Sequence, residues 1–176
     1  MASNDQSINI PLQVGRGGPA GQCILIADDN DSDLLLIQRA LKFAGVLCTV
    51  HAVGDGQEAI AYLKGEGKYA NRVEYPLPSL ALLDLKMPNK SGLDVLRWIR
   101  AHPSLYRLPV LVLTVSNQIP DINRAYALGA NSFINKSLDY QSTKDLAESI
   151  RNFWLTLNCT PRPDSSLPSP NQSETL

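Results

Sequence analysis

One stretch of the sequence, residues 80–92, places a single carboxylate directly after a run of apolar side chains. Its letters are LALLDLKMPNKSG, in which the apolar run ends at Asp84 and the turn-forming Pro88 and Gly92 follow. A continuous apolar run of this length is typical of a strand buried on both faces, as in the middle of a parallel sheet. Because open parallel sheets bind ligands at the carboxyl ends of their strands, Asp84 is a candidate functional residue. The alternative is that Asp84 only begins a surface turn, as many aspartates do.

The same alternation of apolar strand and amphipathic helix recurs along the chain. We expect strands over 23–27, 47–53, 80–83, 110–113 and 132–135. We expect helices from a cap at Asn30 or Asp31 to Gly45, from a cap at Asp55 through Leu63, and over about 91–101, 120–128 and 142–157. The last of these should bury one face made of Leu146, Ile150, Phe153 and Leu157. Right-handed crossovers then give an α/β fold, a doubly wound five-stranded parallel sheet.

Length and charge limit the classes of function. The 176 residues suit one domain, and the formal net charge of -1 gives no electrostatic reason to expect nucleic acid or an anionic membrane as a partner. No apolar run approaches the roughly 20 residues that span a bilayer, and the first residues lack the order of a signal peptide. The three cysteines have no metal-ligand spacing and are expected to be reduced thiols. We therefore expect a cytoplasmic protein that does not enter a membrane.

The domain is expected to cover residues 22–158. Residues 1–21 are polar and end in a glycine-rich run that precedes the first strand, whereas phosphate-binding loops follow a strand. This segment is therefore expected to be a flexible lead-in. Residues 159–176 are rich in Pro and Ser without an apolar pattern, so we expect a disordered tail and no DNA-binding domain.

Polar side chains follow four of the five expected strands. They are Asp28 with Asp29, Asp84, Thr114 and Lys136, which a parallel sheet would gather at one edge. Carboxylates packed together repel one another, and a hard divalent cation such as Mg²⁺ relieves that repulsion. An ammonium and a hydroxyl beside them can contact a phosphoryl group, so Asp84 could act as the nucleophile of phosphoryl transfer. The alternative is an acidic turn with a salt-bridging lysine.

The segments that carry these residues resemble the receiver domains of two-component response regulators, over about residues 22–157. The matching letters are ILIADD at 24–29, LDLKMP at 83–88 with Gly92, PVLVLT at 109–114 and GANSFINK at 129–136. The resemblance implies the flavodoxin-like (βα)5 receiver fold. Within the family, the chain looks like the single-domain regulators that serve phytochrome-type sensor histidine kinases. That likeness depends on LDLKMP, on the loop GEGKYA at 65–70 and on the ending FWLTL at 153–157.

For the site, the resemblance implies that Asp84 accepts a phosphoryl group from a phosphohistidine of the kinase. It implies Mg²⁺ on Asp29, on Asp84 and on the backbone carbonyl of Lys86, with Asp28 acting mainly through water. The protein would then catalyse only its own phosphorylation and dephosphorylation, and it would not be an enzyme in the ordinary sense.

The resemblance also implies a conformational switch. Thr114 would turn toward the phosphoryl group, and Phe133 would pack inward behind it. The surface of the last two helices and the fifth strand would change shape and select a downstream protein target.

Two positions depart from the family pattern. Lys136 is followed by Ser137 where the family usually has proline, often after a cis bond. A cis bond costs about 2.5–4 kcal/mol before a non-proline residue and about 0.5–1 kcal/mol before proline, so we predict a trans bond or a shifted loop. Phe133 stands where tyrosine is frequent, so switching there can only be a change of packing.

Other functions fit part of this pattern. One is a receiver-like interaction module that is never phosphorylated. Another is a phosphatase with a nucleophilic aspartate, but such enzymes need Asp-x-Asp at the end of the first strand followed by Thr or Val. Asp29-Asn-Asp31-Ser lacks that last residue and lies one position late. Trp98 and Trp154 lie on expected helices and favour core or interface packing over a cofactor role, and a homodimer contact through Trp154 and Phe153 is the alternative.

Overall fold

The computed structural model describes residues 22–136 and 139–159, in which five parallel strands form one sheet. The strand order is β2-β1-β3-β4-β5. The bounds are β1 (Cys23–Ala27), β2 (Thr49–Val53), β3 (Leu80–Leu83), β4 (Val110–Thr114) and β5 (Ser132–Asn135). The predicted doubly wound parallel sheet is therefore confirmed. The expected lead-in and all but the first residue of the expected tail lie outside the described residues.

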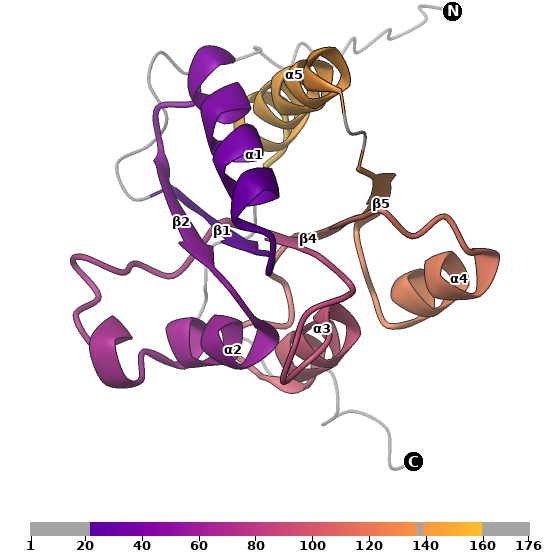
Figure 1. Cartoon of the computed structure of the whole chain (residues 1–176). Coiled ribbons are helices and arrows are strands. Elements are labelled where there is room, and N and C mark those ends of the chain that lie inside the picture. Colours follow the sequence, from indigo (N-terminus) through magenta and orange to yellow (C-terminus); the bar gives the residue numbers. More distant parts are fainter. Residues whose placement is uncertain (1–21, 137–138, 160–176) are drawn as a thin grey trace, which may run out of the picture.

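Helices cover both faces of the sheet (Figure 1). They are α1 (Asp31–Phe43), α2 (Gly56–Lys64), α3 (Gly92–Ala101), α4 (Ile119–Ala127) and α5 (Tyr140–Ser149), with a 3₁₀ turn at Gly67–Tyr69 and a π-helix at Ile150–Leu157. α1 and α5 lie together on one face, and α2 and α3 lie on the other, with α4 next to β5. Among the described residues, no helix combines the length and the apolar character that a membrane span requires.

The side chains of the inner strand β1 alternate between two large clusters of the core, one on each face of the sheet. Ile24 and Ile26 pack with buried residues of α1 and the α5 segment, whereas Leu25 and Ala27 pack with α2 and α3. Successive side chains of a strand point to opposite faces, so a strand covered on both sides must be apolar at every position. This is why β1 and β3 appear in the sequence as unbroken apolar runs rather than as alternating patterns.

The end of the last helical segment corrects one prediction. Ile150 is buried and Leu146 packs against the core, but Phe153 and Leu157 are 53% and 60% exposed. The chain forms a π-helix here, in which the backbone N–H of Asn158 donates to the carbonyl of Phe153, five residues earlier. This wider turn rotates the inward face, so Trp154 and Leu155 pack against the core instead.

The start of α3 fixes the backbone just after β3. Ser91 and Asp94 form a capping box at this helix terminus. The backbone N–H of Gly92 donates to the carbonyl of Leu85 at 3.1 Å, and a Cβ atom at Gly92 would lie 2.0 Å from the carbonyl oxygen of Asp84. Only glycine allows so close an approach, and it lets α3 begin directly against the strand end that carries Asp84.

Candidate functional site

Three carboxylates lie together at the carboxyl edge of the sheet. One oxygen from each of Asp28, Asp29 and Asp84 lies within 4.8 Å of the others. Asp28 and Asp84 are only 2% and 7% exposed, whereas Asp29 is open to solvent. Clustered carboxylate oxygens with one side open to water are the ligands that Mg²⁺ prefers, so the residues present fit such an ion. The structure thus brings these residues together as expected, and their binding of a metal stays a prediction.

Backbone hydrogen bonds continue past the strand ends and hold two of these carboxylates in place. The N–H of Asp28 donates to the carbonyl of Val53 at 3.1 Å, and the N–H of Asp84 donates to the carbonyl of Ala27 at 2.9 Å. Their side chains are fixed as well, because Oδ1 of Asp28 accepts from the N–H of Asn30 and Oδ1 of Asp84 accepts from the N–H of Leu85. The second oxygen of each carboxylate faces the centre of the site, where Lys136 lies.

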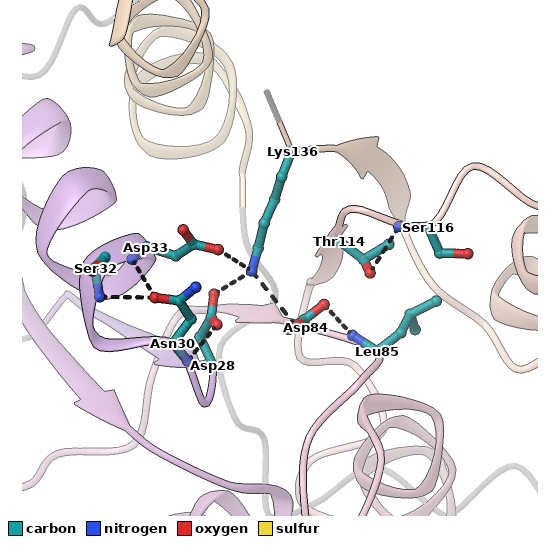
Figure 2. Close-up of polar contacts among 9 residues, drawn as sticks. All are labelled: Asp28, Asn30, Ser32, Asp33, Asp84, Leu85, Thr114, Ser116 and Lys136. Carbon is teal, nitrogen blue, oxygen red and sulfur yellow. Dashed lines mark hydrogen bonds and ion pairs between the residues drawn. The ribbon is translucent and has the colours of Figure 1, made fainter. Parts of the chain in front are cut away.

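Lys136 extends from the end of β5 into this cluster, and three carboxylates surround its ammonium group (Figure 2). The Nζ atom lies 2.5 Å from Oδ2 of Asp28, 3.0 Å from Oδ2 of Asp33 and 3.6 Å from Oδ2 of Asp84. The ammonium donates hydrogen bonds to Asp28 and Asp33, and it forms an ion pair with Asp84 without a hydrogen bond. The Lys136 side chain is 10% exposed, so solvent screens these charges little.

Burial and charge act on the pKa values of this pair in opposite directions. Burial lowers the pKa of the Lys136 ammonium, but its contacts with Asp28, Asp84 and Asp33 together raise that pKa above the ordinary value. Burial raises the pKa of the Asp28 carboxyl, and the hydrogen bonds from Lys136 and Asn30 offset this only in part. Burial therefore disfavours the charged form of Asp28 even beside Lys136, and a bound cation would stabilise that charged form.

Thr114 ends β4 on the other side of Asp84 from Lys136 (Figure 2). Its side chain is fully buried, and its hydroxyl oxygen accepts a hydrogen bond from the N–H of Ser116 at 3.3 Å. The Ser116 hydroxyl in turn donates to Oδ2 of Asp121 at the start of α4, at 2.6 Å. The hydroxyl of Thr114 is therefore engaged within its own loop.

Two other predicted residues lie at the margin of the site. Phe133 on β5 is half-buried and packs against an apolar cluster between α3 and α4, and its N–H donates to the Tyr126 hydroxyl at 3.2 Å. Lys86 is exposed in the loop after β3, and its predicted role as a carbonyl ligand stays a prediction. The predicted trans bond between Lys136 and Ser137 involves a residue outside the described ranges.

Asp33 is the site residue that the sequence did not reveal. It lies in the first turn of α1, where an acidic side chain also complements the helix dipole, and that role alone explains an aspartate at this position. Its contact with Lys136 joins residues 103 positions apart. The sequence has more carboxylates than cations around the end of the first strand. One of these acids could therefore have been expected to pair with a cation from a distant segment.

Comparison with known proteins agrees with this geometry. Residues 24–150 match the family described as the response regulator receiver domain. Response regulator Rcp1 of Synechocystis sp. (strain ATCC 27184 / PCC 6803 / Kazusa) is 36% identical over 132 residues, which cover 75% of this chain and 88% of Rcp1.

Solved structures of similar proteins have the same fold. The crystal structure of the phosphorylated cyanobacterial phytochrome response regulator RcpA has a TM-score of 0.75 and 40% identity, and covers 81% of this chain and all of RcpA (100%). The Mn²⁺-bound form of Rcp1 has a TM-score of 0.73 and 35% identity, and covers 80% of this chain and 99% of Rcp1. The chain therefore belongs to the response regulator receiver domain family.

Proposed function

We propose that this chain acts as the receiver domain of a two-component response regulator, in which Asp84 accepts a phosphoryl group from a sensor histidine kinase. The kinase would be of the phytochrome type, because the similar RcpA is described as a phytochrome response regulator. The observation that carries the proposal is the convergence of Asp28, Asp29, Asp84 and Lys136 at one edge of the sheet. The proposed place of action is the cytoplasm, where such kinases present their phosphohistidine.

In the proposed reaction, a carboxylate oxygen of Asp84 attacks the phosphorus atom of the phosphohistidine. The new P–O bond forms as the P–N bond breaks, and the imidazole, which already carries a proton on its other ring nitrogen, leaves as the neutral ring. Lys136 offsets the negative charge that gathers on the phosphoryl oxygens. Dephosphorylation is a hydrolysis. Water attacks the same phosphorus atom, the P–O bond to Asp84 breaks, inorganic phosphate leaves, and the Asp84 carboxylate is restored.

Mg²⁺ held by Asp28, Asp29, Asp84 and the Lys86 carbonyl would supply further positive charge to the phosphoryl oxygens. In the proposed switch, the Thr114 hydroxyl leaves the N–H of Ser116 and donates to a phosphoryl oxygen. Phe133 then packs inward, and the surface of α4, β5 and α5 changes shape for a downstream protein. The half-buried position of Phe133 supports this proposal, because the ring can move further into the cluster that it already contacts.

The geometry disfavours the two alternatives. An unphosphorylated interaction module has no need for two buried carboxylates beside a buried ammonium, an arrangement that is costly to desolvate. A phosphatase of the Asp-x-Asp type would use Asp29 and Asp31 together, but Asp31 is exposed at the first residue of α1 and is not part of the clustered carboxylates.

Labelling of the whole chain tests the proposal. The protein is incubated with radiolabelled acetyl phosphate and Mg²⁺, and the label is assigned by peptide mapping. A label on Asp84 that survives acid and is lost in base, as an acyl phosphate is, is the expected result. No label would favour the interaction module, and rapid release of phosphate over many turnovers would favour the phosphatase.

We further propose that exposed Phe153 contributes to a homodimer contact. Phe153 is 53% exposed within the π-helix, whereas neighbouring Trp154 packs against the core. Phe153→Ala should therefore shift the gel-filtration volume of the phosphorylated chain toward that of a monomer without lowering its thermal stability. The matched control is Leu35→Ala, which removes an apolar side chain that is 48% exposed on α1. An unchanged elution volume for Phe153→Ala would contradict a contact through this residue.

A further inference from the structure

Among the described residues, Asp33 is the carboxylate in contact with Lys136 that belongs neither to the cluster of three acids nor to a strand end. It projects from the first turn of α1, and its Oδ2 atom accepts a hydrogen bond from Nζ of Lys136 at 3.0 Å. We infer that Asp33 is a positioning residue that holds the Lys136 ammonium so that one N–H stays directed at Asp84. The inference rests on the proposed function, because it concerns phosphoryl transfer to Asp84.

The stereochemistry of an ammonium group gives the first argument. An ammonium has three N–H donors, and here three carboxylates face it. Asp28 and Asp33 each accept one hydrogen bond, at 2.5 and 3.0 Å. The remaining donor faces Asp84, whose oxygen lies at 3.6 Å, too far for a hydrogen bond to the bare carboxylate. A phosphoryl group added to Asp84 would bring an acceptor oxygen closer to that donor.

The space around Lys136 gives the second argument. A cavity of about 160 Å³ lies between α1, β4, β5 and α5. Lys136 and both of its hydrogen-bonded partners, Asp28 and Asp33, line its wall, and the rest of the lining mixes apolar side chains with Asn135, Ser142 and Thr143. The lysine stem is flexible, and its head is a point charge without a fixed direction. With Asp28 as the only hydrogen-bonded anchor, the ammonium could rotate toward this space, whereas the second anchor on α1 prevents that rotation. A catalytic group displaced by about 1 Å can lose a hundredfold in rate.

A simpler role for Asp33 makes a different prediction. If Asp33 only complements the dipole of α1, its loss should resemble the loss of Asp31, the other acidic residue in the same first turn. Asp31 is exposed, so it is the matched control. If instead Asp33 only adds negative charge near the site, its neutralisation should speed the approach of an anionic phosphoryl donor. Positioning predicts the opposite sign, a slower reaction.

The test compares Asp33→Ala, Asp31→Ala and the wild type in the full chain, because alanine removes the acceptor oxygen that asparagine would keep. The rate of acetyl phosphate labelling at Asp84 is measured at saturating Mg²⁺, together with Mg²⁺ affinity and the folded fraction by circular dichroism. We expect Asp33→Ala to be roughly tenfold slower at saturating donor, within the hundredfold that misplacement of a catalytic group can cost, with Asp31→Ala unchanged. An equal or faster rate for Asp33→Ala would overturn the inference.

A double-mutant cycle with Lys136→Met shows whether Asp33 acts through the lysine. If it does, adding Asp33→Ala to Lys136→Met should leave the already slow labelling rate unchanged. A further slowing of about tenfold in the double variant would mean that Asp33 acts independently, and would overturn the inference. The wild-type chain separates this inference from the proposed function. A labelled wild type with a normal Asp33→Ala rate refutes only the role of Asp33. Unlabelled wild type refutes the proposed function and this inference together.

Discussion

The Asp84→Asn variant takes up less than about 1% of the phosphoryl label that the wild-type chain accepts, because an amide oxygen is not a nucleophile of the kind that a carboxylate is. The structure keeps this change local. Oδ1 of Asp84 accepts a hydrogen bond from the N–H of Leu85 at 2.7 Å, and the oxygen of an asparagine can accept the same bond. The measurement is the rate of labelling from acetyl phosphate in Mg²⁺, with base lability of the label as its chemical signature.

Two controls distinguish loss of the nucleophile from loss of the fold. The thermal midpoint of Asp84→Asn should not fall, since the substitution removes one of several carboxylates that repel one another. Asp31→Asn removes an exposed acid from neighbouring α1 and should retain wild-type labelling. Labelling of Asp84→Asn at the wild-type rate would place the nucleophile elsewhere, and the exposed Asp29 of the same cluster would be the next carboxylate to examine.

Much of the fold could be predicted because parallel sheets follow strict rules. The bounds of β1 and β3 agree with the prediction, since these fully buried strands are apolar at every position and end at polar residues. The position of the site could be predicted for the same reason, because it is built from the polar residues that directly follow these strands. Ala27 lies beside Leu83 in the register of β1 and β3, so the residues that follow each strand must be neighbours. A residue that directly follows a strand thus has its place fixed by the topology alone.

The parts that were not predicted depend on packing that has no local signal. The apolar residues of the last helical segment fit a regular α-helical period, yet Trp154 rather than Phe153 packs inward. Burial of the larger indole ring can outweigh the regular backbone pattern, and only the shape of the core decides that. Asp33 was missed for a related reason, because its distance from Lys136 depends on the tilt of α1 and the reach of a flexible side chain.

Replacement of Lys136 by methionine should lower the free energy of unfolding by about 3 kcal/mol in metal-free buffer at pH 7, because buried carboxylates then lack a counterion. Asp28 and Asp84 would lose the ammonium that lies 2.5 and 3.6 Å from them, and neither is open to water. Methionine has a similar length and keeps the packing of the stem. The measurement is chemical denaturation of both chains, with and without Mg²⁺, since a bound cation should restore part of the loss.

The pH dependence of this loss has a definite sign. The pKa of Lys136 lies above its ordinary value of 10.5, so the stability it contributes is fully present at pH 7 and is lost only as the pH rises through that raised pKa. The pKa of Asp28 is raised by burial and lowered by Lys136, so the variant should have a still higher Asp28 pKa. A carboxyl with a raised pKa destabilises the fold as the pH rises through that pKa, and acidification relieves this.

The difference between Lys136→Met and the wild type should therefore shrink as the pH falls from 7 toward 4, and it should shrink with Mg²⁺ at constant pH. The matched control is Lys144→Met on α5, which removes a surface ion pair of 3.9 Å with Glu148 and should cost less than about 1 kcal/mol at any pH. If the difference in the free energy of unfolding changed with neither pH nor Mg²⁺, the stem of Lys136, and not its charge, would stabilise the site. That result would contradict the electrostatic account on which the proposed phosphoryl chemistry depends.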